Sequence, residues 1–195
     1  MQKNRQLIII CGLPATGKST LGKALGEKLH TRWLDLEEHV LFPIFGLPDP
    51  NPYQSKGDTL EELRREFRKS YDLLIHATEA HLDLGRSIII TAPFSNERVQ
   101  QNFMYLQEKY PTCDIFIVYC TTRRGNIEQN EIRKRLATRV FGKDYFGCCN
   151  NLEHYLYDKP RFVEPTVPHL ELDTFPPYTV EECLQKILDH IHSTH

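Results

Sequence analysis

The residues with the clearest chemical signature form a phosphate-binding loop near the start of the chain. Residues 12–19 read GLPATGKS and match the pattern G-x-x-x-x-G-K-[ST]. Gly12 and Gly17 allow backbone angles that turn successive N–H groups toward one anion. Lys18 adds a positive charge for the β- and γ-phosphates of a nucleotide, and the Ser19 hydroxyl can ligate Mg²⁺. We therefore predict that the nucleotide is bound by Gly12, Pro14, Ala15, Thr16, Gly17, Lys18, Ser19 and Thr20.

The segments on either side of this loop support the same interpretation. Residues 7–11 form a short apolar, β-branched run that is typical of a buried strand. After the loop, Leu21, Leu25 and Leu29 recur every four residues, which predicts a helix. The positive end of that helix dipole would face the bound phosphates. A chance match in a glycine-containing turn would lack this strand–loop–helix context.

Two acidic residues supply the candidate catalytic carboxylates. Asp35 and Glu37 form a D-x-E pair where a strand predicted over residues 31–36 ends. If the strand continues to Glu37, its period of two places both carboxylates on the side of the phosphate loop. One could then hold Mg²⁺ or its waters while the other accepts a proton from a substrate hydroxyl. An ordinary acidic helix start at Glu37 is the alternative. The next strand, predicted over residues 87–91, ends at Thr91 instead of an acid, so we assign the metal to Ser19 and Asp35.

Candidate cations come from a basic helix predicted over residues 127–139. Arg135 and Arg139 are four residues apart on one face, so both can reach across a bound nucleotide. A surface helix with salt bridges is the alternative. The expected catalytic residues are therefore Lys18, Asp35, Glu37 and Arg135. A second basic cluster is predicted to be either a solvated helix face or an aid to binding an anionic substrate: Arg64, Arg65, Arg68 and Lys69.

The surrounding elements indicate an α/β fold. Strands are predicted over residues 7–11, 31–36, 87–91, 114–120 and 169–173. Helices are predicted after the loop, from residue 58 to Gly85, over 96–109 and 127–139, and from Thr179, where Glu182 completes a capping box. Residues 140–168 show little periodicity. Such alternation predicts a parallel sheet covered on both faces, with ligands at the carboxyl ends of the strands. The phosphate loop, Asp35, Thr91, Thr121 and Asp173 all lie at such ends.

The composition is that of an ordinary globular domain. The chain has 195 residues, 40% of them hydrophobic, and a net charge of −2 from 24 basic and 26 acidic residues. We expect one cytoplasmic domain over residues 1–195, a monomer or homodimer, with no nucleic-acid or membrane partner. The six cysteines are expected to be reduced, and Cys148, Cys149 and His154 lack the C-x₂-C spacing of a zinc site.

The chain resembles the small P-loop kinases that phosphorylate hydroxyl compounds. This AAA-type ATP-binding kinase-like group includes chloramphenicol phosphotransferase, gluconate kinase and shikimate kinase. The loop GLPATGKST at residues 12–20 is similar to theirs, and Asp35 and Glu37 lie where shikimate and gluconate kinases carry D-x-D. Residues 135–139, RLATR, match the lid pattern R-L-x-x-R. The resemblance covers roughly residues 5–192.

Membership of this group implies a three-layer α/β/α P-loop NTPase fold. Its five-stranded parallel sheet would have the order 2-3-1-4-5, and a helical lid at about residues 123–150 would close on ATP and Mg²⁺. The expected substrate-binding region, about residues 37–84, matches no particular member, so the resemblance leaves the acceptor open.

The expected activity is ATP-dependent transfer of the γ-phosphoryl group to a hydroxyl of a small molecule. A nucleoside or nucleotide kinase is one alternative. A non-enzymatic P-loop nucleotide switch is another, although the chain lacks N-K-x-D and has TAPF after the third strand where D-x-x-G would be required. A nucleic-acid repair factor such as a polynucleotide kinase is the third, and the near-neutral charge argues against it.

Overall fold

The structure is a computed structural model. The structure describes residues 5–45, 58–121, 126–138 and 152–193. Arg139, Cys148, Cys149 and parts of the expected lid and substrate-binding region therefore lie outside the described residues.

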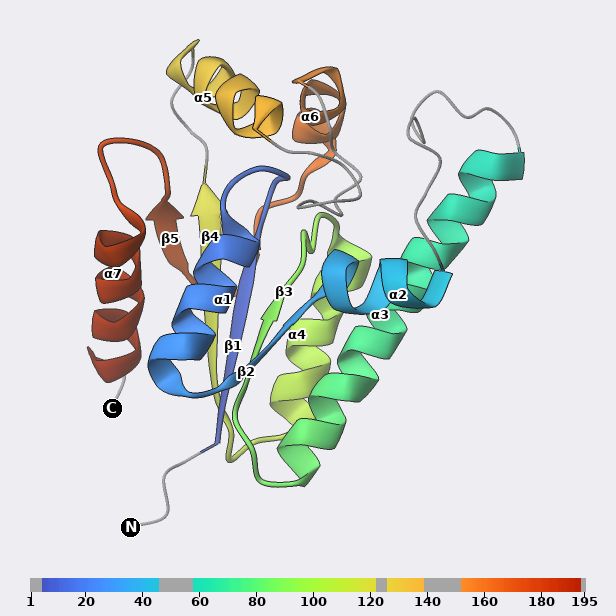
Figure 1. Cartoon of the computed structure of the whole chain (residues 1–195). Helices are drawn as coiled ribbons and strands as arrows, with labels where there is room; N and C mark the ends of the chain where they lie inside the picture. Colours follow the sequence, from blue (N-terminus) through green and yellow to red (C-terminus); the bar gives the residue numbers. More distant parts are fainter. Residues whose placement is uncertain (1–4, 46–57, 122–125, 139–151, 194–195) are drawn as a thin grey trace.

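The centre of the fold is a parallel sheet of five strands in the order β2-β3-β1-β4-β5 (Figure 1). Hydrogen-bond register pairs β1 with β3 and β4 on its two sides, so the strand that leads into the phosphate loop is central. The predicted fold class and strand order are confirmed. The strands are β1 (Gln6–Gly12), β2 (Arg32–Asp35), β3 (Ile88–Thr91), β4 (Asp114–Thr121) and β5 (Leu170–Asp173).

Helices cover both faces of the sheet, as Figure 1 shows. On one face lie α1 (Lys18–Leu29) and α7 (Val180–Ser193), and on the other α3 (Asp58–Asp83) and α4 (Glu97–Lys109). Alternate residues of β1 enter the two cores: Leu7 and Ile9 pack with α3 and α4, whereas Ile8 and Ile10 pack with α1 and α7. This is the strand period of two, and it explains why the whole run is apolar.

Local sequence signals mark the start of two helices and the end of a third, as predicted. Asn96 caps α4 by accepting the N–H of Val99. Thr179 and Glu182 form the predicted capping box at the start of α7, because each side chain accepts the backbone N–H of the other residue. Gly85, with φ +72°, follows α3 and donates its N–H to the Leu82 carbonyl.

Two further helices lie over the carboxyl ends of the strands (Figure 1): α5 (Asn126–Ala137) and α6 (Leu152–Asp158), with a 3₁₀ turn η2 (Lys159–Arg161) after α6. The buried carboxylate of Glu128 on α5 joins them. It accepts the Tyr155 hydroxyl from α6, and Lys159 Nζ lies 2.8 and 2.7 Å from its two oxygens. The sequence did not predict α6, because seven residues are too few to show a helical period.

A π-helical turn η1 (Leu36–Leu41) and a short helix α2 (Phe42–Phe45) follow β2 directly. Helix α3 packs against η1, with Phe67 of α3 in contact with the cluster of Leu41 and Phe42. Within the described ranges, no helix is both long and apolar enough to cross a membrane.

Candidate active site

The phosphate loop joins β1 to α1 and depends on two glycines. A side chain at Gly12, which has φ +137°, would bring its Cβ within 2.5 Å of the Cys120 carbonyl oxygen. Gly17 has φ +88° and begins α1. Both positions are therefore closed to ordinary side chains. The loop is further fixed by the Thr16 hydroxyl, which donates to the Leu13 carbonyl oxygen over 2.8 Å.

Lys18 is the first residue of α1 and is largely buried, with 9% of its surface exposed. Its Nζ donates to the Leu13 carbonyl oxygen over 2.8 Å, so the ammonium group lies along the inside of the loop. In this position the charge is next to the start of a helix, where the dipole also favours an anion.

Asp35 ends β2 and accepts four hydrogen bonds. Its Oδ2 accepts the Ser19 hydroxyl at 2.8 Å and the Thr91 hydroxyl at 2.6 Å. Its Oδ1 accepts the backbone N–H groups of Glu37 and Glu38, each at 3.0 Å, and thereby caps η1. The side chain that was predicted to face the phosphate loop thus contacts that loop through Ser19.

The strand does not continue to Glu37, since β2 ends at Asp35, and the alternative of a helix start at Glu37 is what the structure shows. Because the Asp35 carboxylate caps the next backbone N–H groups, the chain turns into η1 immediately after β2. The argument from strand period therefore fails for Glu37, which lies in the first turn of η1. The structure nevertheless brings the two carboxylates to one cleft, since the helical turn begins at the edge of that cleft.

This cleft lies at the carboxyl edge of the sheet and holds about 490 Å³ of space, part of which is open solvent. One wall belongs to the phosphate loop and the start of α1, and the other to the segments after β2 and β3. The lining residues are Pro14, Ala15, Gly17, Lys18, Ser19, Thr20, Asp35, Leu36, Glu37, Thr91, Ala92 and Pro93.

Tyr71 of α3 supports the far wall of the cleft from behind. Its hydroxyl accepts the N–H of Phe94, which is fully buried and has φ +48°. Burial raises the pKa of Tyr71 far above its ordinary value, and the nearby carboxylates of Glu37 and Asp35 raise that pKa further. The phenol therefore stays protonated and anchors the segment after β3 without adding charge.

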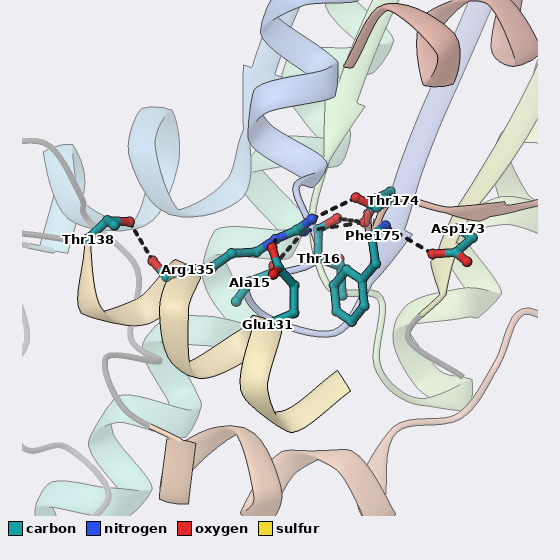
Figure 2. Close-up of polar contacts among 8 residues, drawn as sticks. All are labelled: Ala15, Thr16, Glu131, Arg135, Thr138, Asp173, Thr174 and Phe175. Carbon is teal, nitrogen blue, oxygen red and sulfur yellow. Dashed lines mark hydrogen bonds and ion pairs between the residues drawn. The ribbon is translucent and has the colours of Figure 1, made fainter. Parts of the chain in front are cut away.

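Arg135 of α5 reaches the outside of the phosphate loop (Figure 2). Its Nη1 lies 3.3 Å from the Ala15 carbonyl oxygen and 3.4 Å from Thr174 Oγ1, and its Nη2 donates to the Thr174 carbonyl oxygen over 2.6 Å. The guanidinium also lies 4.5 Å from the centre of the Phe175 ring, and its Nε bonds Glu131 at 3.0 Å. A helix residue is thus joined to the loop and to the segment after β5.

Thr174 and Phe175 are site neighbours that the sequence did not single out. The Thr174 hydroxyl donates to the Thr16 carbonyl oxygen over 2.6 Å, and Asp173 accepts the N–H of Phe175. The strand-end rule pointed to Asp173 itself, whose carboxylate shapes the turn after β5. Among the strand-end candidates, Asp35 and Thr91 line the cleft, whereas Thr121 and Asp173 do not.

The remaining predicted groups lie elsewhere. Arg65 and Arg68 are exposed on α3 and do not line the cleft. Over the described part of the chain, no group of three or more His, Cys, Asp or Glu side chains could hold a metal ion. His154 of α6 is buried, and burial lowers its pKa.

Comparison with known proteins decides the family. A family model described as an AAA domain matches residues 7–144. The chain belongs to this AAA domain family. A search of curated proteins found no significant match.

Solved structures show that the fold of this AAA-domain protein is that of the P-loop kinase group. A candidate kinase from Chloroflexus aurantiacus J-10-fl has a TM-score of 0.68 at 23% identity, covering 100% of both chains. A gluconokinase from Sinorhizobium meliloti 1021 has a TM-score of 0.59 at 13% identity, covering 98% of this chain and 94% of its own. The Mycobacterium tuberculosis APS kinase in complex with AMPPNP and APS has a TM-score of 0.61 at 16% identity, covering 97% and 98%. The resemblance to small P-loop kinases is thus confirmed for the fold.

Proposed function

We propose that the protein is an ATP-dependent phosphotransferase that moves the γ-phosphoryl group of ATP to a hydroxyl group of a small molecule. One observation carries this proposal: the lysine of the phosphate loop, a hydroxyl–carboxylate pair and a second carboxylate line a single open cleft. Phosphoryl transfer needs this set, because the protein mainly positions the reactants and stabilises charge. The similarity of the fold to a gluconokinase and to an APS kinase bound to AMPPNP supports it.

The residues of the cleft fit a magnesium ion. Mg²⁺ is usually held by one or two protein oxygen ligands together with substrate phosphates and water. Ser19 would supply a hydroxyl oxygen, because its proton is already donated to Asp35 over 2.8 Å, and Asp35 would supply the adjacent negative charge. When bound, the ion would neutralise charge on the β- and γ-phosphates.

The hydrogen bonds favour Glu37 over Asp35 as the general base. A carboxylate offers about four acceptor positions, and Asp35 uses four for Ser19, Thr91 and two backbone N–H groups. Glu37 lines the same cleft. In the proposed reaction Glu37 takes the proton of the acceptor hydroxyl as its oxygen bonds to the γ-phosphorus. The bond from that phosphorus to the bridging oxygen breaks, and ADP leaves.

Arg135 is proposed to bind the nucleotide and stabilise the transferred phosphoryl group. Its Nη1 holds the two longest of the guanidinium contacts, to Ala15 O and Thr174 Oγ1, so this is the group most easily redirected. A phosphate oxygen is a stronger acceptor than either of these neutral oxygens. The Nη2 bond to Thr174 and the Nε bond to Glu131 would meanwhile hold the side chain in place.

The test is an ATP-consumption screen with the full chain and Mg²⁺. The acceptors are sugars, polyols, nucleosides, nucleotides, aminocyclitols and hydroxylated antibiotics, with ³¹P NMR to detect the phosphomonoester product. We expect stimulation by one class of hydroxyl compound. Glu37→Gln should bind the nucleotide like wild type but lower turnover by roughly 10²- to 10⁴-fold. Phosphorylation of nucleosides or nucleotides alone would replace the proposed acceptor, and no ATP-dependent product with any class would refute the activity.

A further inference from the structure

Four polar side chains form a continuous chain of hydrogen bonds below the start of α1. Trp33 Nε1 lies 2.9 Å from Thr91 Oγ1, which lies 2.6 Å from Asp35 Oδ2, and Ser19 Oγ lies 2.8 Å from that same oxygen. Trp33 and Asp35 are two residues apart on β2, so their side chains share one face of the sheet. Thr91 is paired with Asp35 in the register of β2 and β3. The neighbouring strands β2 and β3 thus place Trp33, Asp35 and Thr91, and α1 supplies Ser19.

The direction of each hydrogen bond in this chain is fixed by chemistry. An indole N–H can only donate, so the Thr91 oxygen must accept from Trp33. Thr91 is completely buried, and its own proton points to Asp35 Oδ2. The Ser19 proton points to the same oxygen. Asp35 Oδ2 therefore accepts both hydrogen bonds, which keep this oxygen directed at Ser19.

Gly22 of α1, which has no side chain, leaves room for Thr91 and Trp33. A Cβ added at Gly22 would lie 2.5 Å from Thr91 Cγ2 and 2.5 Å from Trp33 Nε1. Both side chains therefore pack directly on the helix backbone, which holds the indole against the threonine. The indole–threonine contact is thus specified by three elements at once: β2, β3 and α1.

We propose that Thr91 is a positioning residue for the divalent-cation site, oriented by Trp33. The inference rests on the proposed function, which assigns that cation to Ser19 and Asp35. An acid at the end of β3 could bind the ion directly, whereas Thr91 acts through Asp35 by fixing the rotation of its carboxylate. Groups that orient metal ligands in this way typically alter metal affinity by about 10- to 100-fold.

The test compares Thr91→Val, Thr91→Ser and Trp33→Phe with wild type. Calorimetry measures binding of a non-hydrolysable ATP analogue across a series of Mg²⁺ concentrations and in EDTA. Thr91→Val should raise the Mg²⁺ concentration for half-maximal binding by about tenfold or more and change binding in EDTA by less than about twofold. Thr91→Ser, which keeps the hydroxyl, should stay within about threefold of wild type, and Trp33→Phe should show a smaller shift than Thr91→Val. Thr78→Val is the matched control, because it removes an equally buried hydroxyl from α3.

A second readout uses the indole itself. Trp33 is the only tryptophan in the chain, so a ¹⁵N-labelled sample gives a single indole N–H signal. That signal should move upfield in Thr91→Val, where the acceptor is lost, and remain in place in Thr91→Ser and Thr78→Val. In wild type it should also shift when Mg²⁺ and the analogue bind together.

The outcomes separate this inference from the proposed function. Wild type that binds no nucleotide in the presence of Mg²⁺ would refute the proposed function. Wild type with Mg²⁺-dependent binding, and a Thr91→Val variant with the same dependence, would overturn the positioning role alone. An equal loss with Mg²⁺ and in EDTA would also overturn it, since that result means general damage to the loop. If Thr91→Val fails to fold, unchanged Mg²⁺ dependence in Trp33→Phe overturns the proposal.

Discussion

Replacing Asp35 with Asn should destabilise the protein as well as weaken the site. Asn has one acceptor oxygen where Asp35 has two. If that oxygen keeps the backbone N–H groups of Glu37 and Glu38, the amide NH₂ meets the Ser19 and Thr91 hydroxyls, which both donate. If the amide is turned round, the NH₂ meets the two backbone N–H groups instead. Either way, two hydrogen bonds to a carboxylate are lost in a site that is only 6% exposed.

The size of the effect follows from this count. Each hydrogen bond to a charged group is worth about 1.5–3 kcal/mol, so two amount to about 3–6 kcal/mol. Reoriented hydroxyls and the removal of a buried charge recover part of this, which leaves about 2–4 kcal/mol. In a domain of this length 1 kcal/mol shifts the melting temperature by about 2–4 °C. We therefore expect Asp35→Asn to melt about 10 °C below wild type, within a factor of two.

The assay is thermal and urea unfolding of the protein without nucleotide, with Glu37→Gln as the matched control. Glu37 lies in the first turn of η1, where loss of its charge near the helix start should reduce the free energy of unfolding by about 0.3–1 kcal/mol. An Asp35→Asn variant within about 0.5 kcal/mol of wild type would refute the reasoning. So would a Glu37→Gln variant that is less stable than Asp35→Asn.

Three further predictions concern the loop, α5 and the core. Lys18→Met keeps the buried stem of the side chain but removes the charge beside Leu13. Calorimetry should show that nucleotide affinity falls by about tenfold or more, with little change in melting temperature. Unchanged nucleotide affinity would show that Lys18 is not part of the site. Arg135→Ala should lower kcat by about 10²-fold with a smaller effect on nucleotide affinity. Arg133→Ala is the control, because Arg133 is exposed on the same helix. Equal kinetics in the two variants would contradict the role of Arg135. Burial raises the pKa of the Cys120 thiol to about 12, so iodoacetamide at pH 8 should leave this residue unmodified in the native protein by peptide mass mapping, and rapid labelling would contradict its burial.

The sequence predicts the fold well because the signals are local and repeated. The apolar run before Gly12 is continuous, since alternate residues enter two different cores, and this is typical of a central parallel strand. The capping box at Thr179 and the stop at Gly85 are likewise short-range effects that any reader of the chain can find. The phosphate loop follows from the same kind of local evidence.

The site is less predictable where one residue has two local tasks. Asp35 ends a strand and caps the next helix, and the alternating pattern around it indicates only the strand. The sequence left a helix start at Glu37 open as an alternative, and Glu38, three residues after Asp35, supports it because an acid at that position often follows a capping residue. The structure shows that this alternative is correct for Glu37.

Contacts between distant segments carry no such sign. Arg135 meets Thr174 across 39 positions of the chain, and Trp33 meets Thr91 across 58. Neither pair belongs to a motif, and Thr91 is notable in the sequence only as the residue standing where an acid was expected. These contacts arise from the order of the strands, which had to be known first.

The hydrogen bond from Lys18 to the Leu13 carbonyl oxygen affects which anions can bind the phosphate loop. An arriving anion competes with an acceptor that is already in place at 2.8 Å, so it must offer the ammonium group a better partner than a peptide oxygen. A phosphate chain meets that condition because its oxygens carry charge and because it engages the helix start at the same time. A weakly basic, singly charged ion gains little by the exchange. The hydrogen bond from Lys18 to Leu13 therefore favours multiply charged phosphates over singly charged anions at this loop.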